Sequence, residues 1–289
     1  MQSSEPCSLS APLERKFALV VGVNGAADRA SILAQLKYAE NDATALAAAL
    51  VRPACGFTLP VPALLGASAR ANEIKRALHT LLLQSTSQDA LLFFFSGHAL
   101  PVRLADGSVD IFLVTHDFDP ALAAREAALA ISLRWLWQYL YAAPDAGNIL
   151  IVLDCCYAGN FASAAADRLN IDMRGLLHMV QDDINITNET WRSRSRIVLT
   201  ATGYNQEAYE RDMHGRMSGL LIAALHGEVA AVRDQRGRVS IQRLHEYLQD
   251  QLPEQLPYLL SNLTSPYILA DYGPIMAAER HERDAMIGP

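Results

Sequence analysis

The chain has little basic charge and no long apolar run, and each shortage excludes a class of protein. Its 24 Lys and Arg residues against 31 Asp and Glu residues give a net charge of −7. That balance disfavours a protein dedicated to binding nucleic acid or an anionic membrane surface, so neither is expected as a partner. No run reaches the roughly 18 apolar residues that a membrane-spanning helix needs. The first 16 residues lack the pattern of a secretory signal.

Cysteine is also scarce. The chain has only Cys7, Cys55, Cys155 and Cys156, and two of these are adjacent. This pattern excludes a disulfide framework and a zinc site built from two cysteine pairs. We therefore expect a reduced, cytoplasmic protein. Hydrophobic residues make up 51% of the chain and charged residues 19%, which excludes intrinsic disorder as its main state.

Apolar runs alternate along the chain with segments of helical periodicity. Strands are predicted at residues 17–23, 90–95, 149–153 and 197–200, with minor ones at 61–65, 111–114 and 265–270. Helices are predicted at residues 38–50, 71–84, 132–141, 219–225 and 241–252. This alternation predicts an α/β fold with a mostly parallel central sheet and helices on both faces.

Polar residues follow the predicted central strands where ligands and chemistry gather, at the carboxyl end of a parallel sheet. Two of these positions carry His98 and the pair Cys155 and Cys156. A cysteine and a histidine at neighbouring strand ends form a candidate nucleophile and base. Alternation along the strand places Asp154 and Cys156 on one side and Cys155 on the other, which favours Cys156 over Cys155 as the nucleophile. The alternative is a structural histidine and a buried cysteine that acts as a small apolar residue.

These segments resemble those of caspases and metacaspases. Residues 95–98 (FSGH) resemble the segment that carries the family's histidine, and residues 153–159 (LDCCYAG) resemble the metacaspase segment D-S-C-H-S-G. Residues 41–43 (NDA) are similar to the start of the family's first helix. The resemblance to the metacaspase and paracaspase branch extends over about residues 16–270. It implies a caspase-like fold in a single domain.

The resemblance also divides the chain. It implies an N-terminal extension at residues 1–15, a peptidase domain at 16–275 and a tail at 276–289. Within the domain it implies a large-subunit-like half at about 16–160, a linker at about 160–195 and a small-subunit-like half at about 196–275. The linker offers basic sites for self-cleavage at Arg168, Arg174, Arg192 and Arg194.

The activity implied by the resemblance is that of a cysteine endopeptidase. The thiolate of Cys156 attacks the peptide carbonyl, and His98 protonates the leaving amine and then activates water. Backbone N–H groups of Ala99 and Cys156 are the implied oxyanion donors. The family usually has glycine where this chain has Ala99, so a methyl group is expected beside the substrate carbonyl.

The resemblance further implies a protein or peptide substrate with Arg or Lys at the P1 position, the residue before the cleaved bond. The implied pocket residues are Asp154 and Asp42, with Glu210 as a third candidate. Structural alternatives exist for the first two. Asp42 fits an acid in the first turn of a helix, where it stabilises the helix dipole, and Asp154 fits a carboxylate that caps a turn.

No cofactor is expected. Calcium is the one ion that some metacaspases bind, and Asp117 and Asp119 are the candidates for it, although they lack a recognisable ligand spacing. Histidines elsewhere, His214 among them, show no metal-ligand spacing either. The resemblance implies a role in regulated proteolysis such as cell death or antiviral defence, with an activator that is a separate protein, ion or small ligand. The oligomeric state stays open. The alternative function is a catalytically silent caspase-like module that binds a partner and signals by conformation.

Overall fold

The computed structural model describes residues 15–27, 33, 35–141, 147–156, 195–201, 210–211, 213–255, 257–261 and 266–278. For Tyr141, Cys156, Glu210 and Arg211 it describes the backbone alone. The predicted linker, up to residue 194, and its four arginines lie outside these ranges. No helix within the described ranges is long and apolar enough to cross a membrane.

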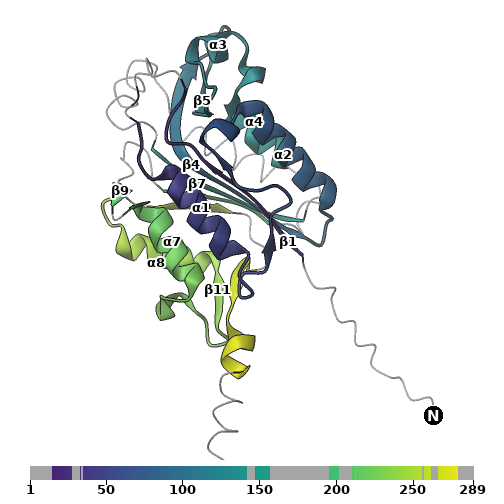
Figure 1. Ribbon diagram of the computed structural model, residues 1–289, viewed down its shortest axis with the longest axis vertical. Coiled ribbons are helices and arrows are strands. Elements are labelled where there is room, and N and C mark those ends of the chain that lie inside the picture. Colours follow the sequence, from purple (N-terminus) through teal and green to yellow (C-terminus); the bar gives the residue numbers. More distant parts are fainter. Residues whose placement is uncertain are drawn as a thin grey trace, which may run out of the picture.

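A central sheet runs through the molecule in the strand order β12-β8-β7-β4-β1-β2 (Figure 1). Its parallel core consists of β1 (Lys16–Gly22), β4 (Ala90–Arg103), β7 (Asn148–Cys156) and β8 (Arg196–Thr200). All four of the main predicted strands are therefore confirmed. The edge strand β12 (Tyr258–Ser261) is antiparallel to β8, while the short strands β2 (Phe57–Thr58) and β3 (Leu64–Leu65) pair with β1.

Helices cover both faces of this sheet, as predicted. One face carries α1 (Ala39–Leu50), α7 (Arg216–His226) and α8 (Ile241–Gln251), and the other carries α2 (Ala71–Gln84) and α4 (Leu133–Tyr141). Alternate residues of each central strand face opposite sides, so β4 gives Phe94 to the α1 side and Phe95 to the α2 side. Both are fully buried, which explains why a strand with helices on both faces reads as a continuous apolar run.

Strand β4 is longer than predicted. Instead of ending at Phe95, it continues to Arg103 and changes partners on the way. Residues up to His98 pair with β7, and the remainder pairs with the antiparallel strand β5 (Val109–Leu113). Leu100 and Val102 pack there in a small separate core with Phe112. The end of β4 was predicted too early because its residues after His98 form a strand only through their pairing with β5.

Smaller elements complete the described part. Next to β5 lie β6 (Ile131–Ser132), α3 (Pro120–Arg125) and the short 3-10 helix η2 (Ala127–Leu129). Two more 3-10 turns are η1 (Gly66–Ser68) and η3 (Ala230–Val232). A hairpin of β9 (Glu210–Arg211) and β10 (His214–Gly215) precedes α7. The predicted last strand is β13 (Ile268–Asp271), which pairs with β11 (Arg238–Ser240) in a separate two-stranded sheet.

Candidate active site

His98 and Cys156 come together through the pairing of β4 with β7. These parallel strands are in register from Ala90 opposite Asn148 to His98 opposite Cys156, the last residue of β7. Adjacent strands lie about 4.8 Å apart, so the backbones of the two residues are neighbours. The side chain of His98 is buried, with 8% of its surface exposed. The structure thus places the predicted nucleophile and base at one edge of the sheet.

The two adjacent cysteines differ in their environment. Cys155 is 2% exposed and packs in the core on the α2 and α4 face. Asp154 lies on the opposite face, where its carboxylate contacts Ser218 of α7. In a strand, every second residue faces the same side, so alternation assigns Cys156 to the same face as Asp154. The prediction that Cys155 and Asp154 face opposite sides of the sheet is confirmed, while Cys156 as the nucleophile stays a prediction.

Asp42 and Asp154, hereafter the acidic pair, both lie next to Gly215. A methyl group added to Gly215 would lie 2.7 Å from Oδ2 of Asp154 and 3.1 Å from Oδ2 of Asp42. Both carboxylates are buried, with 1% and 5% of the surface of Asp42 and Asp154 exposed. Asp42 comes from the first turn of α1 and Asp154 from β7, so the fold brings together two acids that the sequence keeps far apart.

Asp42 accepts hydrogen bonds from three residues. The backbone N–H of Gly215 lies 3.2 and 3.1 Å from its two oxygens, and Oγ of Ser96 donates to Oδ2 at 3.1 Å. Nδ1 of His214 lies 2.7 Å from Oδ1. Burial, and next the negative charge of Asp154, raise the pKa of Asp42 to about 7, although the bonds from His214 and Gly215 act in the opposite direction.

Asp154 is held by the first turn of α7. The backbone N–H of Ser218 donates to its Oδ2 at 3.0 Å, and the hydroxyl of Ser218 donates to the same oxygen. The first N–H groups of a helix lack partners within the helix, and its N-terminus favours negative charge. The structural alternative for Asp154, a capping carboxylate, is therefore present, and it coexists with the position of Asp154 beside Asp42.

The remaining predicted residues are more loosely connected to this site. Glu210 pairs with Gly215 in the β9–β10 hairpin, which places its backbone next to the acidic pair. Ala99 is fully buried, and its methyl group packs in the core on the α2 face. The expectation of a methyl group beside the substrate carbonyl is therefore wrong, because residues 98 and 99 of a strand face opposite sides.

This architecture matches a known family. The sequence model of the peptidase C14 family, described as Caspase domain, matches residues 15–268. The chain belongs to the caspase-domain family. This is a family of cysteine peptidases, so the resemblance on which the site was predicted is confirmed.

Solved structures agree with this assignment. The crystal structure of protein GSU0716 from Geobacter sulfurreducens superposes on this caspase domain with a TM-score of 0.61 at 17% identity, covering 89% of this chain and 97% of that one. The structure of pro-sf-caspase-1 gives a TM-score of 0.50 at 13% identity, covering 89% and 94% of the two chains. At these identities the likenesses show the fold alone. No curated protein sequence matches the chain.

The calcium candidates of this caspase domain have structural partners. Oδ1 of Asp117 accepts from the backbone N–H of Ala71 at 2.9 Å, at the start of α2. Asp119 caps α3 through the N–H groups of Ala121 and Leu122. Among the described residues, no group of three or more His, Cys, Asp or Glu side chains is arranged to hold a metal ion.

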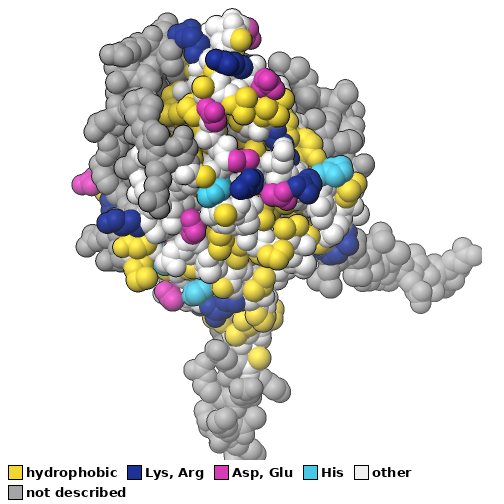
Figure 2. Space-filling model, turned by 45° about the horizontal axis from the view of Figure 1, so that its top comes forward, with side chains coloured by type: hydrophobic (Ala, Val, Ile, Leu, Met, Phe, Trp, Pro, Cys, Tyr) yellow, Lys and Arg dark blue, Asp and Glu magenta, His cyan; other side chains and the backbone are white. Residues whose placement is uncertain are grey.

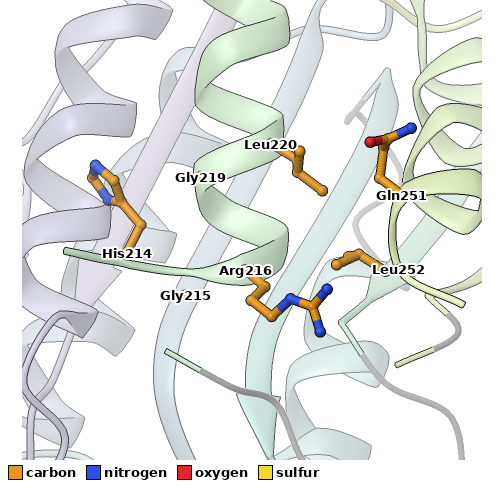
Figure 3. A pocket seen from close by; sticks show the side chains of 7 residues that line it. All are labelled: His214, Gly215, Arg216, Gly219, Leu220, Gln251 and Leu252. Carbon is orange, nitrogen blue, oxygen red and sulfur yellow. The ribbon is translucent and has the colours of Figure 1, made fainter. Parts of the chain in front are cut away.

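Sequence reasoning missed His214, Gly215 and Ser218, which complete the acidic pair. His214 was expected to have no role because it shows no metal-ligand spacing, whereas it contacts Asp42. Beside it lies a cavity of about 250 Å³ (Figure 3). The residues that line the cavity are His214, Gly215, Arg216, Gly219, Leu220, Gln251 and Leu252. No local sequence signal indicated the three missed residues, because the helix was predicted to begin at residue 219, whereas α7 begins at Arg216, directly after Gly215.

Proposed function

We propose that this caspase domain is a cysteine endopeptidase that cleaves peptide bonds after Arg or Lys. The observation that carries the proposal is the register of β4 and β7, which pairs His98 with Cys156 at the end of β7. A nucleophile and its base must lie within reach of one another. The register of two neighbouring parallel strands supports this, because it makes the backbones of the two residues neighbours.

In the proposed reaction the thiolate of Cys156 attacks the carbonyl carbon of the scissile bond. His98 protonates the leaving amine as the C–N bond breaks, which leaves an acyl group on sulfur. His98, now neutral, takes a proton from water as the water oxygen attacks the acyl carbon. The C–S bond then breaks, which releases the acid and regenerates the thiolate of Cys156 beside protonated His98. Backbone N–H groups of Ala99 and Cys156 are the proposed donors to the oxyanion.

The acidic pair supports a basic P1 residue. The two buried carboxylates next to Gly215 repel one another, which contributes to the raised pKa of Asp42. A guanidinium or ammonium group between them lowers this repulsion and forms charge-assisted hydrogen bonds. A P1 aspartate instead adds a third negative charge to a buried site, which costs free energy. Glu210 is a third proposed contact, on the strength of its backbone position opposite Gly215.

The surface supports a protein or peptide substrate rather than nucleic acid. Among the described residues on the face that Figure 2 shows, basic and acidic side chains are interspersed among hydrophobic ones, without a large basic patch. The net charge of −7 agrees with this distribution. A part in regulated proteolysis, such as cell death or antiviral defence in the cytoplasm, is proposed from the family alone.

Covalent labelling tests the proposal. Peptidyl chloromethyl ketones that end in Arg or Asp are incubated with the full chain, and the modified residue is identified by intact mass and peptide mapping. We expect the Arg reagent to label Cys156 faster than the Asp reagent and the Cys156→Ala variant to remain unmodified. Labelling at Cys155 would contradict the assignment of the nucleophile. Absence of labelling by both reagents would favour the catalytically silent module.

A further inference from the structure

The imidazole of His214 contacts the carboxylate of Asp42, which the proposed function assigns to binding of the substrate. Its Nδ1 lies 2.7 Å from Oδ1 of Asp42. In Figure 3 the ring extends from β10 away from Leu220, Gln251 and Leu252 on the other side of α7. A histidine side chain is the one partner among the donors to Asp42 that carries a positive charge when protonated.

Three donors already contact Asp42 while His214 is in place. A carboxylate has about four acceptor positions; His214 and Ser96 each contact one oxygen, and the single N–H of Gly215 is shared between both oxygens. Ser96 and Gly215 are buried, whereas 28% of the side-chain surface of His214 is exposed. A cation that arrives from solvent to bind Asp42 therefore has to replace His214 rather than the other donors.

The turn that carries His214 contacts α1 and contains a residue with an uncommon backbone conformation. Met213 has a φ of 71°, in the left-handed region that residues other than glycine rarely adopt. The side chain of Asn41 donates to the carbonyl oxygen of Met213 at 2.9 Å, next to the contact of Asp42 with His214. Two consecutive residues of α1 thus hold two consecutive residues of the turn, and the contact at Met213 positions the backbone that carries the imidazole.

We propose that His214 is a specificity-determining residue that holds Asp42 in the substrate-free protein and yields this carboxylate to the P1 cation of the substrate. The proposal rests on the proposed function and adds a competitor to it. A P1 arginine or lysine carries a full positive charge and gains a charge-assisted bond to Asp42 by displacing the imidazole. A neutral P1 side chain gains no such bond, so it leaves the contact in place.

Binding of p-aminobenzamidine, an aromatic mimic of the arginine side chain, tests this competition without turnover. The experiment uses the full chain with Cys156→Ser, alone and combined with His214→Ala or His214→Gln. His226→Ala is the matched control, because His226 is the last residue of α7, the helix that follows β10, and pairs with Glu228 at 3.6 Å. If the contact with His214 is formed in about nine-tenths of the molecules, its removal tightens the apparent affinity about tenfold. We expect that gain for Ala, a smaller gain for Gln and none for the control.

Two outcomes overturn the proposal. One is an affinity that is unchanged or weaker in both His214 variants. The other is an absence of benzamidine binding in every variant. Hydrolysis of an Arg peptide by the chain with Cys156 intact provides the second readout, and we expect His214→Ala to lower KM while kcat stays the same. If benzamidine binding tightens but no Arg peptide is hydrolysed, the role of His214 is supported and the peptidase function is contradicted.

Discussion

His98 and Cys156 are the last pair of residues in register between β4 and β7. Their proximity depends on the most buried part of the sheet, where Phe94 and Phe95 of β4 are fully buried. His98 belongs to neither of the two large apolar clusters on the faces of this sheet, so its substitution tests chemistry rather than folding.

Replacing either member of the pair should abolish peptide hydrolysis. We expect Cys156→Ala to remove activity and His98→Ala to lower kcat by at least about 100-fold, the lower range for general acid–base catalysis. Cys155→Ala is the matched control, because Cys155 packs in the core on the opposite face. Hydrolysis rates and thermal unfolding curves of the three variants provide the comparison. An equal loss of activity in Cys155→Ala with an unchanged melting temperature would place the nucleophile at Cys155.

Asp154→Ala should lose cleavage after Arg far more than it loses thiol reactivity. Removing one partner of a buried charge pair costs about 2–5 kcal/mol, so we expect a correspondingly lower kcat/KM and a nearly unchanged rate of alkylation by iodoacetamide. Asp154 also accepts hydrogen bonds from Ser218, so part of its effect is structural. Ser218→Ala removes the hydroxyl contact but keeps the charge. An equal loss of kcat/KM in Ser218→Ala would contradict a direct role of Asp154 in reading the substrate.

The stability of the protein should fall as pH rises through neutrality because of Asp42. Its pKa rises from 3.8 to about 7 on folding, mainly through burial. The folded state therefore binds more protons than the unfolded state between these values, and the free energy of unfolding decreases as pH increases. Asp42→Asn removes this dependence. We therefore expect the free energy of unfolding of the variant, relative to that of wild type, to increase by about 1–3 kcal/mol from pH 5 to pH 8.

Urea denaturation at pH 5 and pH 8 measures this effect. Asp250→Asn, at an exposed position of α8, controls for the loss of one carboxylate. Identical pH dependence in wild type and Asp42→Asn would show that Asp42 keeps an ordinary pKa in the folded protein.

Gly215→Ala should disrupt the acidic pair. The new methyl group would lie 2.7 Å from a carboxylate oxygen of Asp154 and 3.1 Å from one of Asp42, so the carboxylates or the β9–β10 hairpin must shift. We expect weaker p-aminobenzamidine binding and a loss of stability of about 1–3 kcal/mol, as for overpacking of a core. Gly25→Ala is the control, because its methyl group meets no atom closer than 3.6 Å. Equal behaviour of the two variants would show that the acidic pair tolerates a side chain at residue 215.

The central strands of the sheet, and the face to which their side chains point, could be predicted from the sequence. The apolar runs of β1, β4, β7 and β8 are signals of buried parallel strands. The rule that chemistry gathers at the carboxyl ends of parallel strands predicted that His98 lies near Cys156. The family resemblance predicted that Asp42 and Asp154 share one pocket. Alternation also indicated that Cys155 lies away from Asp154, as the core packing confirms.

The partners of Asp42 could not be predicted from the sequence. His214 contacts it across 172 positions of the sequence, and the contact depends on where the β9–β10 hairpin docks on α1. No local pattern encodes such a distance. The extension of β4 escaped prediction for the same reason, since Leu100 and Val102 are buried only by the return of β5.

The P1 preference tests the central claim most directly. Two fluorogenic peptides that differ only in Arg or Asp at P1 are compared with the wild-type chain, with Cys156→Ala as the blank. We predict a kcat/KM for the Arg peptide that exceeds that for the Asp peptide by at least about 100-fold, the ratio that corresponds to some 3 kcal/mol of charge discrimination. A preference for the Asp peptide, or no hydrolysis above the Cys156→Ala blank, would contradict the account.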